Sequence, residues 1–222
     1  MKKPTHEIEV KRLLLGARAR DKFLKALGKP VRKENTQINY IFDTDDRSLD
    51  KARYALRLRV EDSKGFLTAK GPGRKVGSST ASKLEAESPV DPGLVEAIRS
   101  GRQDPLAALK RRVTDPAFRD LWRGIEEIRA GRPMKLWGHF ENLRRTIPVV
   151  LPSGLRLQVQ TDQTRFPDGS VQSEVEVELP ADDRAQEVES WVENVARAAG
   201  IETQAGPPKI VRFFAALGRV KQ

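Results

Sequence analysis

Glu7-Ile8-Glu9-Val10-Lys11, close to the start of the chain, alternates three charged side chains with two β-branched apolar ones. Successive side chains of a β-strand point to opposite faces, so the charged residues would share one face and the apolar residues the other. Taken alone, this alternation is the ordinary signature of a strand with one buried and one solvent-exposed face.

The same design recurs along the chain. At least six further segments pair an apolar face with a polar or charged one, and acid-rich and base-rich segments occur in comparable number. In chain order they are Leu56-Arg57-Leu58-Arg59-Val60, Leu67-Thr68-Ala69-Lys70, Lys83-Leu84-Glu85-Ala86-Glu87, 142–147, 155–162 and Ser173-Glu174-Val175-Glu176-Val177-Glu178-Leu179.

Strand faces rich in acid and faces rich in base are most stable when they lie toward each other. Cross-strand pairs of opposite charge stabilise a sheet, whereas like charges on one face repel. We therefore predict an α+β fold in which a closed barrel surrounds a polar interior wide enough for a ligand. The apolar faces would point outward under helices. An open sheet with one charged, solvated face is the alternative.

Composition limits the class of protein. The chain has 222 residues, of which 32% are charged and 38% hydrophobic, a size that fits one large β-rich domain or two small ones. No segment approaches the ~20 apolar residues of a membrane helix, and Met1-Lys2-Lys3-Pro4 leads into the first strand without an apolar signal region. We therefore expect a cytoplasmic protein without a membrane partner. The absence of cysteine excludes disulfides, thiolate metal sites and a cysteine nucleophile.

The charge balance favours an anionic partner. The formal net charge is +10, from 41 Lys and Arg against 31 Asp and Glu, which suits nucleic acid, polyphosphate, nucleotide or acidic lipid. Aromatic residues make up only 6% of the chain, too few for the basic patches with interleaved aromatics that bind nucleic acid, so no nucleic acid is expected. We interpret Lys110-Arg111-Arg112 and the basic residues Arg18, Arg20, Lys22 and Lys25 as solvated helix faces.

The order of elements predicts one domain over residues 1–222 with a helical insertion at about 93–133. Apolar spacings of three and four predict helices at 21–27, within 93–132 and at 184–199. Strands are predicted at 37–44, 52–60, 65–70 and 82–89, and again from Leu136 onward with turns at Pro152-Ser153-Gly154 and Pro167-Asp168-Gly169.

Two segments could be mistaken for ligand loops. Gly71-Pro72-Gly73-Arg74 lacks the Gly-Lys-Ser/Thr ending of a phosphate-binding loop, so we interpret 71–79 as a mobile loop at the mouth of the barrel. Asp43-Thr44-Asp45-Asp46 lacks the glycine and the final glutamate of a calcium loop, and is interpreted as an acidic turn.

Taken together, the chain resembles the CYTH family, the group of adenylyl cyclases and thiamine triphosphatases also called triphosphate tunnel metalloenzymes. The family's N-terminal signature, Glu-x-Glu-x-Lys, is matched by Glu7, Glu9 and Lys11. Further matches follow in order along most of the chain outside the helical insertion: Tyr40-Ile41-Phe42-Asp43-Thr44, Ala55-Leu56-Arg57-Leu58-Arg59, Thr68-Ala69-Lys70-Gly71-Pro72, Glu85 with Glu87, Asp162, the triple Glu174/Glu176/Glu178, and Lys209. The segment Pro207-Pro208-Lys209-Ile210-Val211 looks most similar to the thiamine-triphosphatase branch.

The resemblance implies an eight-stranded antiparallel barrel that forms a tunnel for a linear triphosphate and a divalent metal. Arginine offers two parallel donors to phosphate oxygens and lysine a mobile point charge. Arg144 is favoured over Arg145 as the tunnel residue because it shares strand parity with Asn142 and Thr146. The candidate phosphate-binding residues are Lys11, Arg57, Arg59, Lys70, Arg144 and Lys209.

Glutamates in the same tunnel would repel a triphosphate unless a cation bridges them to it. Mg²⁺ or Mn²⁺ fits an all-carboxylate set, and zinc does not, because neither His6 nor His139 has a histidine or cysteine partner at ligand spacing. The candidate metal ligands are Glu7, Glu9, Glu174, Glu176 and Glu178. Lys83, Glu85, Glu87 and Asp162 are expected to line the tunnel, and Lys11, Arg57, Arg59 and Glu176 are the candidate catalytic residues.

The resemblance leads us to expect a metal-dependent triphosphate hydrolase that acts on tripolyphosphate first and thiamine triphosphate second. An adenylyl cyclase that converts ATP to cyclic AMP, and a polyphosphate-binding module without turnover, are the alternatives. The sequence gives no indication of the oligomeric state.

Overall fold

The strands close into a barrel in the computed structural model, which describes residues 6–179 and 181–220. The sheet order is β10-β1-β9-β8-β7-β2-β3-β4-β6-β5, all pairs are antiparallel, and an additional pairing of β1 with β6 joins the two sides. Eight strands therefore form the wall, with β10 and β5 added at its edges. The bounds are β1 His6–Leu15, β2 Lys33–Asp43, β3 Ala55–Glu61, β4 Lys64–Lys70, β5 Arg74–Lys75, β6 Thr80–Val90, β7 Lys135–Val150, β8 Arg156–Arg165, β9 Val171–Leu179 and β10 Glu202–Gln204.

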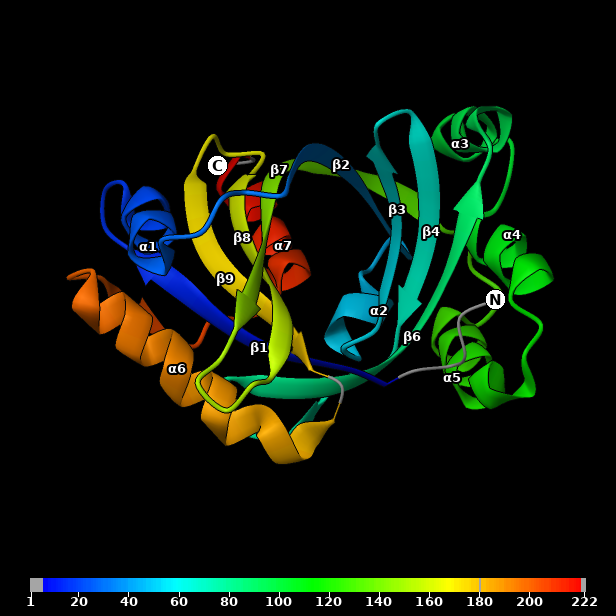
Figure 1. Ribbon diagram of the computed structural model, residues 1–222. Coiled ribbons are helices and arrows are strands. Elements are labelled where there is room, and N and C mark those ends of the chain that lie inside the picture. The colour runs from blue at the N-terminus through cyan, green and yellow to red at the C-terminus, as the bar shows by residue number, and fades with distance from the viewer. Residues whose placement is uncertain (1–5, 180, 221–222) are drawn as a thin grey trace.

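Figure 1, a view through the ring of strands, shows α1, α3, α4, α5 and α6 outside the ring and α2 and α7 within its outline. The helices are α1 Ala19–Leu27, α2 Ser48–Lys51, α3 Pro92–Arg99, α4 Pro105–Arg112, α5 Arg119–Arg129, α6 Ala185–Ala198 and α7 Lys209–Val220, with short 3₁₀ segments at Pro116–Phe118 and Asp182–Arg184. None of the helices in the described ranges is both long and apolar enough to cross a membrane.

The apolar faces of the strands form the cores beneath these helices. Val10 and Val175 are fully buried in one cluster, which packs against Val188 of α6. Leu58 is fully buried in a second cluster under α3, α4 and α5, where Ile125 contributes from α5. The predicted outward direction of these apolar side chains is confirmed, and so is the closed, antiparallel, eight-stranded fold.

A third cluster lies at α7, and it differs from the other two because it uses inward-facing wall residues. Phe213 and Phe214 of α7 pack with Ile41 of β2, Phe140 of β7 and Phe166 after β8. Ile41 and Phe140 also line the barrel cavity. The helix α7 therefore approaches the lumen and brings its own side chains to the wall (Figure 1).

Several local expectations need correction. The third strand begins at Ala55 rather than Ala52, because 48–51 forms α2 and Arg53 takes a left-handed conformation with φ 64°. The loop 71–79 contains the two-residue strand β5, and α7 was not predicted at all.

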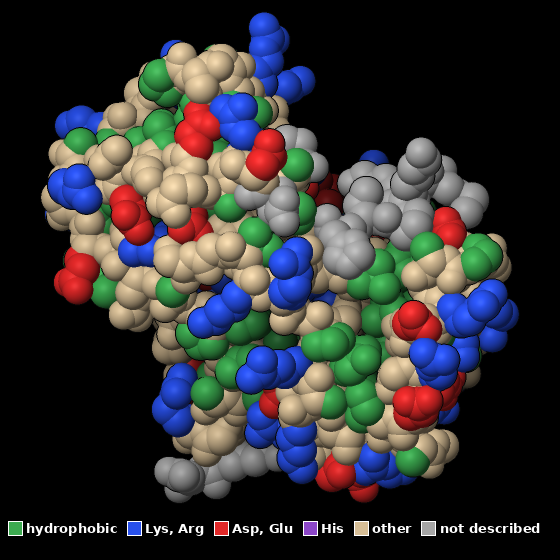
Figure 2. Space-filling view, turned by 90° about the horizontal axis from the view of Figure 1, so that it is seen from below, with side chains coloured by type: hydrophobic (Ala, Val, Ile, Leu, Met, Phe, Trp, Pro, Cys, Tyr) green, Lys and Arg blue, Asp and Glu red, His purple; other side chains and the backbone are tan. Residues whose placement is uncertain are grey.

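One of the basic residues expected on a solvated face is buried. Arg20 is 6% exposed; a terminal nitrogen of its guanidinium donates to the carbonyl oxygen of Leu143 at 3.5 Å, and its Nε lies 3.9 Å from Asp21. Lys22 and Lys25 on the same helix are exposed as expected. Figure 2 shows basic and acidic side chains interspersed over one face of the molecule, with the basic ones gathered near its middle.

Candidate active site

The barrel encloses a cavity of about 1500 Å³ whose wall is densely charged. Twelve Lys and Arg residues and nine Asp and Glu residues line it. Thirteen of the sequence-predicted site residues are among them: Glu7, Glu9, Lys11, Arg57, Arg59, Lys70, Lys83, Glu85, Glu87, Arg144, Glu176, Glu178 and Lys209. The remaining two, Asp162 and Glu174, lie behind the cavity surface and are 0% and 1% exposed.

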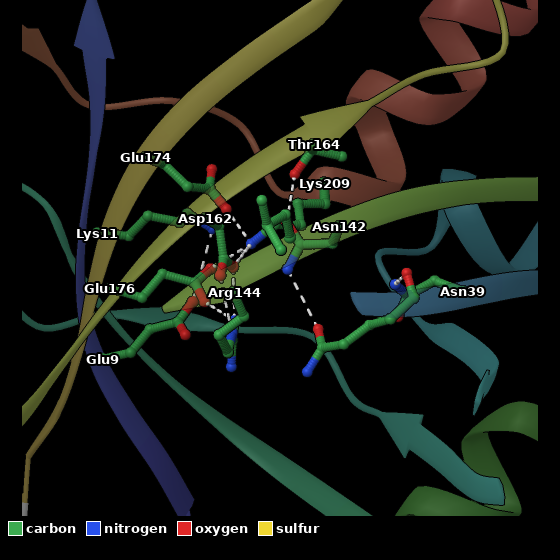
Figure 3. A network of polar contacts seen from close by, with 12 residues as sticks. Glu9, Lys11, Asn39, Asn142, Arg144, Asp162, Thr164, Glu174, Glu176 and Lys209 are labelled. Atoms are coloured by element: carbon green, nitrogen blue, oxygen red, sulfur yellow. Dashed lines mark hydrogen bonds and ion pairs between the residues drawn. The ribbon is translucent and has the colours of Figure 1, made fainter. Parts of the chain in front are cut away.

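Asp162, Glu174 and Glu176 form a buried carboxylate cluster on β8 and β9. One oxygen from each lies within 4.8 Å of the others. Strand register produces the cluster, because Arg144, Asp162 and Glu174 occupy directly opposed positions on β7, β8 and β9. Figure 3 shows the three carboxylates converging from the two strands.

Three cations surround this carboxylate cluster. Arg144 donates from Nε to Asp162 Oδ1 at 2.8 Å, and its terminal nitrogen lies 2.6 Å from Asp162 and 2.5 Å from Glu176. The ammonium of Lys209 lies 2.7 Å from Asp162 Oδ2 and 2.8 Å from Glu176 Oε1, and it contacts Glu174.

Arg212, one turn along α7 from Lys209, completes the set. It pairs with Glu174 and donates to Gln172 at 2.7 Å. In this structure the three acids are thus matched by three cations that hold their orientation.

The surroundings shift the acidities of these groups. Burial acts to raise the pKa of Glu176, but Lys209 and Arg144 hold it well below the usual range. Burial also acts to raise the pKa of Asp162, but Arg144 and Lys209 outweigh it, so this pKa is lowered. For Glu174 burial prevails, so its pKa is raised. Burial alone would lower the pKa of Lys209, yet the three carboxylates raise it, so its ammonium is retained.

The carboxylate cluster has the chemistry of a site for a hard divalent ion. Its donors are oxygens only, which suits Mg²⁺ or Mn²⁺. Glu174 Oε1 is buried and accepts no hydrogen bond in good geometry, although the Lys209 ammonium touches it. Asp162, expected only to line the tunnel, thus joins Glu174 and Glu176 as a potential ligand. Of the other metal candidates, Glu178 follows Glu176 on β9, and Glu9 lies opposite Glu178 on the adjoining strand β1 and beside Glu176 in Figure 3. Glu7 lines the cavity further along β1.

A second set of ion pairs lies across the cavity on β1, β4 and β6. Lys70 bridges Glu7 at 2.5 Å and Glu85 at 2.9 Å. On the neighbouring strand β3, Arg59 pairs with Glu87 at 3.2 Å and approaches Glu61 at 3.8 Å. These lysine and arginine side chains are therefore compensated by acids within the wall.

Other cations of the lumen have no acid partner. Within the described ranges, no carboxylate lies at ion-pair distance from five of the cavity-lining cations. Arg57 makes only long contacts, 3.4 Å to Asn39 and 3.5 Å to Thr68. Burial is the largest cause that lowers the pKa of Lys83. Glu9 acts to raise this pKa, and the nearby Lys11 and Lys70 lower it further. The five are Lys33, Arg53, Arg57, Lys75 and Lys83.

The two adjacent arginines of β7 point to opposite sides of the wall. Arg144 faces the lumen, as its contacts with Asp162 and Glu176 show. Arg145 pairs with Glu34 and lies 3.5 Å from Asp21 of α1 on the outside. The parity argument for Arg144 is confirmed.

A row of neutral polar side chains runs along the lumen wall, and of its members only Asn142 was placed on the tunnel face from the sequence. Thr164 donates to Asn142 at 2.9 Å, Asn142 donates to Gln37 at 3.1 Å, and Gln37 donates to Glu61 at 2.8 Å. Part of this row appears in Figure 3, where Asn142 and Thr164 lie beside the carboxylate cluster. Their strand parity with the charged lumen residues was the available signal. Arg212 was missed for a different reason, because its role depends on the unpredicted helix α7.

The segment 71–79 borders the cavity through Gly71, Gly73, Arg74, Lys75 and others. It is held from outside by Glu189 of α6, which is 2% exposed. Glu189 accepts hydrogen bonds from Ser78 Oγ at 2.7 Å, from the Ser79 backbone N–H at 2.9 Å and from Thr80 Oγ1 at 2.5 Å. The predicted position of the segment beside the cavity is confirmed, whereas its mobility stays a prediction. The sequence offered no sign of its anchor.

The acidic segment 43–46 has a structural role. Asp43 is 1% exposed and accepts hydrogen bonds from the backbone N–H groups of Thr44, Leu49 and Asp50. It thereby caps the start of α2, which agrees with a turn and not with a calcium loop.

Several solved structures are similar to this protein over nearly its whole length. HpAC1 from Hippeastrum, a putative adenylyl cyclase described as having a dominant triphosphatase activity, is 24% identical, with a TM-score of 0.75 over 94% of this chain and 95% of that one. A putative adenylate cyclase from Bacillus halodurans is 21% identical, with a TM-score of 0.67 over 95% and 99%. PH1819 from Pyrococcus horikoshii is 15% identical, with a TM-score of 0.53 over 96% and 99%.

At these identities the structural likenesses establish the fold. No curated protein is significantly similar to the chain in sequence. The family comparison is more extensive, because the CYTH domain model matches residues 5–214, nearly the whole chain. This protein therefore belongs to the CYTH family.

Proposed function

We propose that this protein hydrolyses a linear triphosphate in the presence of Mg²⁺ or Mn²⁺, with tripolyphosphate as the preferred substrate and thiamine triphosphate next. The observation that carries the proposal is the set of five unpaired cations in a lumen that also holds a buried carboxylate cluster. Arg57 and Lys83 are partly buried, and unpaired cations in such a confined, partly desolvated space attract a polyanion strongly. Lys33, Arg53 and Lys75 are exposed and add to the positive field. A linear triphosphate supplies several negative charges in a shape that fits a tunnel.

The arginines and lysines of the lumen would divide the work of binding. Arg57 has free donors and would grip phosphate oxygens directly. Lys83, also unpaired, is added to the phosphate-binding set beyond its expected lining role. Lys11, Arg59, Lys70 and Arg144 already contact acids, so they would contribute by sharing their charge or by exchanging partners when the substrate enters.

The acidic residues would hold the metal. Asp162, Glu174 and Glu176 form the best-defined set of donors, and Glu7, Glu9 and Glu178 remain proposed ligands from β1 and β9. When bound, a divalent ion supplies charge neutralisation on phosphate oxygens and activation of water. Glu176 is the one member of the carboxylate cluster that borders the cavity, so it is placed to accept a hydrogen bond from an attacking water.

A phosphate-release panel with tripolyphosphate, thiamine triphosphate and ATP tests this proposal, with a cyclic-AMP assay on the ATP samples. We expect phosphate release that requires Mg²⁺ or Mn²⁺ and is fastest with tripolyphosphate. Full activity in excess EDTA, with the metal content of the protein checked, would contradict the metal assignment.

The same panel distinguishes the hydrolase from the two alternative functions, an adenylyl cyclase and a polyphosphate-binding module. Cyclic AMP and pyrophosphate formed from ATP would identify a cyclase, and tight binding of all three compounds without turnover would identify a polyphosphate-binding module. HpAC1 is described as a putative adenylyl cyclase with a dominant triphosphatase activity, which supports testing both activities on one preparation.

A further inference from the structure

The ammonium of Lys209 lies at the centre of the carboxylate cluster. It is within 2.8 Å of oxygens from Asp162 and Glu176 and contacts Glu174 as well. These are the same three residues whose oxygens converge to within 4.8 Å of one another. In Figure 3 the lysine side chain enters from α7 and ends among the three acids.

An ammonium and a divalent ion are stabilised by the same kind of site. Both are compact cations stabilised by several carboxylate oxygens, and the divalent ion carries twice the charge. The two ions repel each other, so they cannot both lie among the same three carboxylates. The site in this structure is therefore already neutralised by a side chain of the protein.

The remaining cations would stay in place if Lys209 left. Arg144 holds Asp162 and Glu176 from the β7 side, and Arg212 holds Glu174 from α7. The acids would keep their orientation for an incoming ion. The side chain of Lys209 could turn into the cavity, because Lys209 borders the cavity and is the first residue of α7.

We propose that the Lys209 ammonium competes with a divalent ion for Asp162, Glu174 and Glu176, and that metal binding releases Lys209 into the lumen to bind a phosphate. The first part concerns the metal alone. The second part rests on the proposed function. Lys209 would then couple the order of binding, since a phosphate would gain this cation only after the metal has replaced it.

Calorimetric titration of Mn²⁺ into metal-stripped protein, without any phosphate, tests the competition. Lys209→Met removes the ammonium and keeps a flexible chain, so Mn²⁺ should bind at least about tenfold more tightly than to the unchanged protein, equivalent to about 1.4 kcal/mol. Lys22→Met is the control. It removes one positive charge from the exposed face of α1, outside the lumen, and should change the affinity by about threefold at most.

Equal gains in the two variants, or no gain in Lys209→Met, would overturn the competition. If Lys209→Met does not fold, Lys209→Gln provides the same comparison. A thermal-unfolding series then gives a second readout, because added Mn²⁺ should raise the melting temperature more in the Lys209 variant than in the unchanged protein.

The release step is measured through coupling between ligands. A non-hydrolysable tripolyphosphate analogue is titrated with and without Mn²⁺, and the metal should increase its affinity by a larger factor in the unchanged protein than in Lys209→Met. The same factor in both proteins would reject the release of Lys209. If the analogue does not bind at all, the proposed function fails, while the Mn²⁺ titration still decides the competition.

Discussion

Arg57 and Glu176 represent the two kinds of charged residue that the proposed function requires. Among the residues that the structure describes, Arg57 has no acid at ion-pair distance, whereas Glu176 is buried among cations. One is available to a polyanion and the other is suited to a metal. Substitutions at these two positions should therefore fail in different ways.

Arg57→Ala should weaken triphosphate binding whether or not metal is present. Loss of a hydrogen bond to a charged group costs about 1.5–3 kcal/mol, a factor of roughly ten to a hundred or more in affinity. Glu176→Gln should instead abolish most turnover, with partial recovery at high Mn²⁺, and leave metal-free binding unchanged or tighter because a repulsive carboxylate is gone. Calorimetry on both variants, with and without metal, measures the difference.

Arg145→Ala is the matched control for Arg57→Ala. It removes an arginine from the barrel wall, but one that pairs with Glu34 on the outside. Its affinity and turnover should stay within about twofold of the unchanged protein, as for other exposed ion pairs. If Glu176→Gln weakens metal-free binding as much as Arg57→Ala does, the assignment of Glu176 to the metal is wrong.

At the scale of elements, the contact between α6 and the segment 71–79 connects an outer helix to the cavity mouth. Glu189 accepts three hydrogen bonds from residues 78–80, and the chain passes so close to it that a Cβ added at Gly77 would lie 2.5 Å from Glu189 Oε1. An alanine at position 77 would therefore displace the Glu189 carboxylate from its place. The segment therefore presents Arg74 and Lys75 at the mouth in a position determined outside the barrel.

Gly77→Ala and Glu189→Ala should both loosen this segment. We expect faster hydrogen exchange over residues 71–79 without substrate, and a higher KM for triphosphate with a smaller change in kcat, because binding groups at the mouth are displaced and the carboxylate cluster is not. Glu187→Ala is the control and should change neither quantity, because Glu187 is a half-buried acid on the same helix that accepts a hydrogen bond from Ser153, away from 71–79. Unchanged exchange in Glu189→Ala would contradict the anchoring role.

The same anchor predicts a pH dependence. Burial acts to raise the pKa of Glu189, but the hydrogen bonds from Thr80, Ser78 and Ser79 prevail and lower it. Its contribution is therefore fully present above the pKa of an unfolded glutamate, about 4.3, and is lost as the pH falls through the lowered value. Exchange in 71–79, corrected for the intrinsic rate, should accelerate below about pH 4 in the unchanged protein. A Glu189→Gln variant should lack this acceleration.

At the scale of the whole molecule, the barrel has its apolar cores outside and its charges inside. Leu58 and Arg57 are neighbours on β3 that illustrate the arrangement, one fully buried under the helices and the other lining the cavity. Stability and ligand binding should therefore depend on opposite faces of the same strand.

Leu58→Ala should lower the free energy of unfolding by about 2–5 kcal/mol, because it leaves a cavity in a closely packed core. Its triphosphate affinity, measured on the folded fraction, should be little changed. Arg57→Ala should show the reverse, with a small effect on stability, since no ion pair is lost. Chemical denaturation and calorimetry on the pair provide the measurement, and equal destabilisation by both variants would contradict this division.

Much of this architecture could be predicted because alternation is a local property. The side chains of Glu7-Ile8-Glu9-Val10-Lys11 must point to alternate faces in any strand, so the separation of charged and apolar faces follows from the order of residues. The choice of Arg144 over Arg145 rested on the same rule and is confirmed. Membership of the CYTH family could also be predicted from spaced motifs along the chain.

Other features depend on which strands and helices meet. Asp162 and Glu174 are twelve positions apart, and they become opposed neighbours only through the register of β8 and β9. Closure of the barrel joins β1 to β6, about 75 residues further along the chain. Arg20, expected on a solvated face, is buried because α1 packs against the wall beside β7.

The helix α7 shows most directly what only the tertiary structure decided. Lys209 could be identified as a phosphate-binding candidate from its motif, but its place among three carboxylates depends on where α7 docks on the barrel. The sequence by itself determined which residues carry charge and which face of each strand they occupy, because those properties follow from neighbours along the chain. The tertiary structure alone decided which charges meet and which stay unpaired, because Coulomb interactions depend on distances between residues far apart in the sequence.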